Sequence, residues 1–113
     1  MREFNIEYNG KTYTCCITRQ VMKKLELQEG FALGETKPIS MVYTLFYGSL
    51  MTKHPFIKRR DAEKMLDDLT VPDENGEVEY DLVEIYEELI AMTKDCYDTQ
   101  ENVKAKKSIK NSI

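Results

Sequence analysis

Residues 4–17, FNIEYNGKTYTCCI, decide the fold of this 113-residue chain. Apolar and polar side chains alternate on both sides of Asn9-Gly10, which is the period of a strand with one buried face. Asn-Gly favours a type I′ turn, because both central residues of that turn have positive φ. The stretch therefore predicts a β-hairpin. Helical spacing begins directly afterwards, with Thr18 as the expected N-cap of the first helix.

Four helices are expected after the hairpin, at residues 19–28, 41–53, 62–69 and 81–97. Ser40 and Asp61 are the expected N-caps of the second and third helices. Residues 31–38 and 71–79 contain glycine and proline and are expected to be connectors. The pattern predicts an α+β, mostly helical fold, with an N-terminal two-stranded β-hairpin packed on three to four α-helices. Residues 1–97 are expected to form one domain, and 98–113 a Lys-rich, flexible tail.

The predicted helix at 41–53 is apolar nearly all round, which favours burial on more than one side. One face carries Val42, Leu45, Phe46 and Ser49, and the other carries Tyr43, Tyr47, Leu50 and Met51. Tyrosine and methionine suit adaptable contact surfaces. This helix is therefore expected to be either the centre of the domain or part of an interface, with Tyr43, Tyr47, Leu50 and Met51 as candidate partner-binding residues. The alternative is that these side chains simply fill the core.

Charge is segregated along the chain, whose net charge is −4. Residues 1–60 carry +5, residues 61–98 carry −12 and residues 99–113 carry +3. Such segregation favours contacts between the basic part of one copy and the acidic part of another. The candidate self-association residues are Lys58, Arg59, Arg60, Glu84, Glu87 and Glu88. The alternative is that the acidic residues form an ordinary solvated helix face.

No residue pattern points to catalysis, a cofactor or a metal. His54 is the only histidine and precedes Pro55, so it is expected to be a surface turn residue. The cysteines at 15, 16 and 96 have neither disulfide-framework nor zinc spacing, and of the adjacent pair one is expected to face the core and the other to face outward. We therefore expect no enzyme, no cofactor and no metal ion.

The composition also bears on location and partners. No run approaches the roughly 18 apolar residues that a membrane span needs, and the N-terminus has no apolar signal-peptide core. The pI near 5.1 disfavours nucleic-acid binding, because phosphate contacts need a basic face. A cytoplasmic protein that binds neither membranes nor nucleic acid is therefore expected.

The order of these patterns is similar to that of a known family. FNIEYNGKTY at residues 4–13 leads into a helix containing KKLE at 23–26, and the aromatic helix MVYTLFYGSL follows at 41–50. An acidic short helix at 61–69 and an acidic amphipathic helix at 81–97 complete the pattern. This layout, over residues 4–97, resembles the tail assembly chaperones of long-tailed bacteriophages and their prophages.

The resemblance implies a protein that coats the tape measure protein and keeps it soluble until the tail tube assembles around it. It also implies self-association into a homo-oligomer, possible contact with the tail tube protein, location in the host bacterial cytoplasm and absence from the mature virion. A head–tail completion or other phage adaptor protein is the first alternative. A small DNA-binding regulator is the second.

Overall fold

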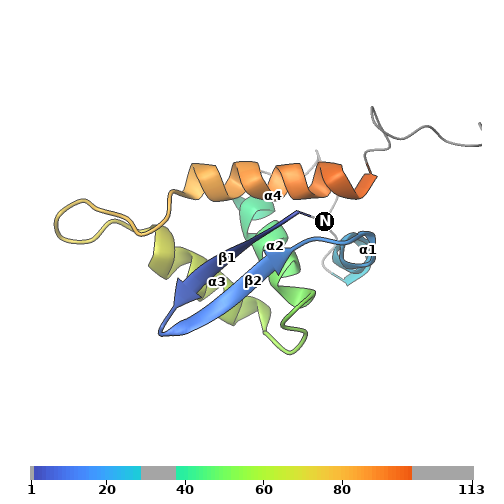
Figure 1. The fold of residues 1–113 in the computed structure, drawn as a ribbon, viewed down its shortest axis with the longest axis horizontal. Coiled ribbons are helices and arrows are strands. Elements are labelled where there is room, and N and C mark those ends of the chain that lie inside the picture. The colour runs from blue at the N-terminus through green and yellow to red at the C-terminus, as the bar shows by residue number, and fades with distance from the viewer. Residues whose placement is uncertain (1, 29–37, 98–113) are drawn as a thin grey trace, which may run out of the picture.

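The computed structural model describes residues 2–28 and 38–97. Strands β1 (Glu3–Tyr8) and β2 (Lys11–Cys16) form an antiparallel hairpin, and four helices follow. The helices are α1 (Arg19–Gln28), α2 (Pro38–Met51), α3 (Arg59–Thr70) and α4 (Leu82–Tyr97). The hairpin lies over α2 and α3, and α4 runs along another side of α2 (Figure 1). The predicted α+β, mostly helical fold is confirmed.

The hairpin has the predicted turn. Asn9 and Gly10 both have positive φ, 52° and 78°, and Tyr8 pairs with Lys11 across the turn. Side chains from the two connections that flank α3 contact both edges of the hairpin. The Glu7 amide donates to the Tyr80 hydroxyl at 3.2 Å, and the Thr14 amide donates to Nε2 of His54 at 3.2 Å. Such contacts occupy edge groups that would otherwise be free to pair with another strand.

Helix α2 is the centre of the domain, which was one of the two positions expected for it. It contacts α1, α3, α4 and β2, and Leu45, Phe46 and Leu50 are fully buried. Gly48 faces α1, where the absence of a side chain lets Val21 and Leu25 approach the α2 backbone closely. The packed centre of the fold is therefore one helix with other elements on several sides, which explains why its sequence is apolar nearly all round.

Two predicted helix starts are wrong. Helix α2 begins at Pro38, so Ser40 lies inside its first turn and is not the N-cap; proline suits this position because its fixed φ is already helical. Helix α3 begins at Arg59 after Lys58, which makes no side-chain capping bond, and Asp61 is an acidic residue of the first turn. A carboxylate there still favours the helix through the helix dipole.

The other two helix starts agree with prediction. Thr18 Oγ1 accepts a hydrogen bond from the Val21 amide at 3.1 Å, as an N-cap does. Asp81 Oδ1 accepts one from the Val83 amide at 2.8 Å at the start of α4. The structure does not describe residues 29–37 and 98–113. Nearly all of the predicted connector at 31–38 and the whole predicted tail at 98–113 therefore lie outside the described residues. None of the helices within residues 2–28 and 38–97 is long and apolar enough to cross a membrane.

The prediction that only one of the adjacent cysteines faces inward is wrong, because both Cys15 and Cys16 are fully buried. They lie at the end of β2 next to Ile17, whose carbonyl accepts a hydrogen bond from the Cys96 thiol at 3.0 Å. The hairpin is thus covered on both faces at this end. Burial raises the pKa of the Cys15 thiol to about 12, so it is a neutral core side chain at physiological pH.

His54 holds β2 to the end of α2, and this makes the stability of the fold dependent on pH. Its Nε2 accepts a hydrogen bond from the Thr14 amide, and the centroid of its ring lies 5.0 Å from that of the Tyr13 ring. Burial, and then the positive charge of Lys11, lower the pKa of His54. The unfolded chain therefore takes up this proton more readily than the folded chain does.

We expect the stability that His54 contributes to be complete above its unfolded pKa, about 6.5, and to be lost as the pH falls below that value. Urea unfolding at about pH 7.5 and about pH 5.5 measures the loss. His54→Gln is the control, because the amide oxygen can still accept from Thr14 but does not titrate. Equal pH dependence in the two proteins would show that His54 is not responsible.

Candidate functional site

One side of α2 carries an apolar row that reaches the surface. Ile39, Tyr43, Tyr47 and Met51 follow one another at intervals of four residues and form what we call the α2 stripe. Ile39 is 65% exposed, and the other three are half-buried against the core. Residues four apart form a ridge along a helix, and such ridges pack into the grooves of a partner helix.

Helix α3 fixes the orientation of one member of the α2 stripe. The Tyr43 hydroxyl donates a hydrogen bond to the Asp67 carboxylate of α3. This bond, followed by burial, raises the pKa of Tyr43 to about 12, so the hydroxyl remains a donor over the physiological range. Nη2 of Arg59 donates to Thr44 Oγ1 at 2.9 Å and joins the start of α3 to the same part of α2. The aromatic ring of Tyr43 is thereby held in place at the surface.

The structure changes the membership of the predicted partner-binding set. Tyr43, Tyr47 and Met51 lie together on the α2 stripe, but Leu50 is 0% exposed and belongs to the core. A fully buried side chain cannot contact a partner in this conformation. Ile39 was missed because the predicted helix began at residue 41; its position four residues before Tyr43 was the available signal.

The predicted basic cluster only partly faces solvent. Arg59 forms an ion pair with Glu63 on α3, with 2.7 Å between Nε and Oε2, in addition to its bond with Thr44. Lys58 and Arg60 are exposed, and Arg60 lies 3.6 Å from the carboxylate of its neighbour Asp61. Arg59 thus connects α2 and α3, whereas Lys58 and Arg60 remain accessible.

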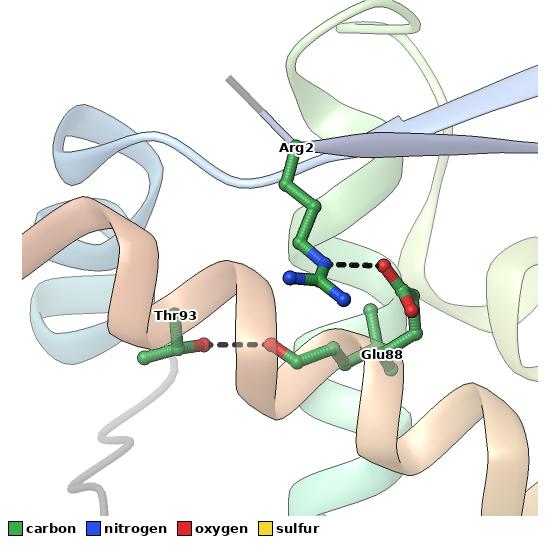
Figure 2. A network of polar contacts seen from close by, with 4 residues as sticks. Arg2, Glu88 and Thr93 are labelled. Atoms are coloured by element: carbon green, nitrogen blue, oxygen red, sulfur yellow. Dashed lines mark hydrogen bonds and ion pairs between the residues drawn. The ribbon is translucent and has the colours of Figure 1, made fainter.

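The predicted acidic cluster is divided in the same way. Glu88 of α4 forms an ion pair with Arg2, with 2.6 Å between Oε1 and Nε, and this contact ties the start of β1 to α4 (Figure 2). The hydrogen bond with Glu88 raises the pKa of Arg2. Glu84 and Glu87 are exposed. Helix α4 lies along the top of the body in Figure 1 and the start of α3 lies below it, so the accessible acidic and basic residues are on separate elements.

A groove lies where the hairpin meets the connection between α2 and α3. Its volume is about 610 Å³. The lining residues are Tyr8, Lys11 and Tyr13 of the hairpin, residues 53–57 of the connection, and Asp61, Lys64 and Met65 of α3. Phe56, one of the lining residues, is 94% exposed. The sequence alone does not predict this groove, because its lining comes from separate segments of the chain, residues 8–13 and 53–65.

A polar contact holds the hairpin wall of the groove against α3. The Tyr8 hydroxyl and Nζ of Lys64 both donate to Oδ2 of Asp68, the lysine at 3.0 Å. The hydrogen bond from Tyr8, followed by that from Lys64, lowers the pKa of Asp68. Lys11 lies on the same wall, with its Nζ 5.0 Å from the centroid of the Tyr13 ring. The groove is therefore an aromatic surface with lysines along it.

No group of three or more His, Cys, Asp or Glu side chains that could hold a metal ion occurs among the residues that the structure describes. A protein-family model described as a domain of unknown function (DUF5055) matches residues 2–109 of the sequence. The chain belongs to this family. The match spans the hairpin, all four helices of the described structure and the residues between them. No curated protein and no solved structure matches the chain significantly.

Proposed function

We propose that this DUF5055 protein is a tail assembly chaperone of a long-tailed phage or prophage, which binds the tape measure protein, keeps it soluble and self-associates along it. The α2 stripe is the observation that carries the proposal. It supplies a row of apolar side chains at the spacing that an extended helical client can pack against. The tail tube protein is a further possible partner, and the host cytoplasm is the expected place of action.

The composition of the α2 stripe supports binding to a long and variable apolar surface. Tyrosine presents a large ring at a low cost in conformational entropy, and methionine adapts its shape to different neighbours. The bond between Tyr43 and Asp67 fixes one ring in advance, which reduces the ordering cost of binding. A client with an apolar face would cover Ile39 and the exposed parts of the other three side chains.

The accessible charges support self-association between different surfaces of the molecule. Lys58 and Arg60 lie at the start of α3, and Glu84 and Glu87 lie on α4. A contact that joins two different surfaces leaves one of each free on the assembly, so copies can add in a ring or a helical row. Such a row would suit a long client better than a closed dimer would.

Ile39→Glu tests the role of the α2 stripe. The side chain is 65% exposed, so we expect the fold to tolerate the change, while a buried carboxylate in the complex would weaken binding by about tenfold or more. The measurement is the amount of tape measure protein, co-expressed from the same phage or prophage genome, that is recovered in soluble form with the chaperone.

Leu27→Glu is the matched control, because Leu27 is an 86% exposed aliphatic residue on α1 and not on the α2 stripe. It should recover as much client as the unmodified protein does. If Ile39→Glu also recovers an unchanged amount, the α2 stripe is not the client surface. If both variants recover equally less client, the α2 stripe is again not the client surface, because the added charge would then act at any exposed position.

A further inference from the structure

The groove is positively charged in an acidic protein. Its lining includes Lys11 and Lys53, and also Lys64, whose Nζ is paired with Asp68; the only carboxylate in the lining is that of Asp61, whereas the whole chain has a net charge of −4. The apolar part of the lining includes Phe56, 94% exposed, and Met65, almost fully buried. A complementary occupant must therefore combine carboxylates with a small number of apolar side chains.

The loop between α3 and α4, residues 71–79, has this composition. It projects from the body of the molecule (Figure 1), and Val71, Glu74, Glu77, Val78 and Glu79 in it are exposed. We call it the acidic loop. Its only charged residues are acidic, so it would meet the lysines of the groove with carboxylates and Phe56 with valine side chains.

The acidic loop is ordered by its own hydrogen bonds. Oδ1 of Asp73 accepts from the amides of Asn75 and Glu77 at 2.8 and 2.9 Å, and the Asp73 amide donates to the Glu77 carbonyl at 2.8 Å. Gly76 has a φ of 79°, a conformation that glycine adopts without strain. A loop that is already folded loses little conformational entropy when it binds.

We propose that the acidic loop of one copy docks in the groove of a second copy, with Glu74 and Glu77 beside Lys11 and Lys53, and with Val78 against Phe56. This inference rests on the proposed function and places its self-association contact in the groove and the acidic loop, so Lys58, Arg60, Glu84 and Glu87 lie outside that contact. The loop and the groove are different surfaces, so every copy in an assembly can use both. The contact is therefore head-to-tail and can be repeated from copy to copy.

Charge reversal on each side tests the contact in the full chain. The groove variant is Lys11→Glu with Lys53→Glu, and the loop variant is Glu74→Lys with Glu77→Lys. Sedimentation velocity over a range of concentrations should show self-association of the unmodified protein. Each variant alone should associate about tenfold or more weakly, because like charges then face each other.

Mixing the two variants gives the decisive result. In an equimolar mixture the lysine-bearing loop meets the glutamate-bearing groove, and the unmodified loop meets the unmodified groove. Both contacts are then complementary, so the mixture should recover the association of the unmodified protein. Lys23→Glu with Lys24→Glu is the control, since it makes the same charge change at exposed positions of α1 and should associate normally.

Four results would overturn the proposal: a monomeric unmodified protein at all concentrations, variants that associate normally, a mixture that does not recover, or a control that weakens equally. Displacement of the second copy by the tape measure protein would also overturn it, because the groove would then be the client site. Failure here is distinguishable from failure of client binding, which is measured separately through Ile39→Glu on the α2 stripe.

Discussion

Phe46→Ala should lower the free energy of unfolding by about 3–5 kcal/mol. Phe46 is fully buried at the middle of α2, which contacts the hairpin's second strand and the other three helices. Truncation removes the transfer free energy of the ring and leaves a cavity that surrounding elements cannot all close at once. A loss of this size is a large part of the stability of a small domain. Urea unfolding, followed by circular dichroism, measures the change.

Phe56→Ala is the matched control, with the same chemical change at a side chain that is 94% exposed. It should alter the free energy of unfolding by about 0.5 kcal/mol or less. The contrast between the two phenylalanines tests the assignment of α2 as the centre of the fold. Similar losses in both variants, or a small loss for Phe46→Ala, would show that the packing around α2 is not as described.

Gly48→Val should lower the free energy of unfolding by about 3 kcal/mol. A Cβ atom at Gly48 would lie 2.7 Å from Cδ1 of Leu25 and 3.2 Å from Cγ1 of Val21. Both side chains belong to the buried face of α1, so they have little room to move. The added atoms would force α1 away from α2, and this cost exceeds the improvement in helix propensity over glycine. Thermal unfolding is a suitable measurement, with urea unfolding to check it.

A double-mutant cycle separates this clash from a general effect on α2. Leu25→Ala alone should be destabilising, because it leaves a cavity. In the double variant with Gly48→Val it removes the nearest clash. The free energy of unfolding lost in the double variant should therefore be smaller, by about 1 kcal/mol or more, than the sum of the losses in the two single variants. Strict additivity would show that Gly48 does not lie against Leu25.

The type and order of the described elements could be predicted because local signals agree with the packing. Asn9-Gly10 specifies the hairpin, and the apolar residues of α1, α3 and α4 recur at helical spacing. Helix starts were less predictable. Pro38 begins α2 although a serine stands two residues later, and α3 begins without a side-chain cap, so capping residues alone did not locate these starts.

The candidate site could be predicted only in part, because its chemistry depends on tertiary contacts. Tyr43, Tyr47 and Met51 share a helix side that spacing reveals, but nothing in the sequence separates the buried Leu50 from them. The partners of Arg59 on α2 and of Glu88 at the N-terminus are distant in sequence. His54 also has an unforeseen role, since its partner Thr14 lies 40 residues earlier.

The central claim is that this protein is a chaperone for a tape measure protein. The most direct test is to co-express the two from the same phage or prophage genome and to determine the mass of the soluble fraction by size-exclusion chromatography with light scattering. We expect both proteins to elute together, with many copies of the chaperone on each tape measure chain. An insoluble tape measure protein beside a chaperone that elutes alone would contradict the proposal and would favour a head–tail adaptor role.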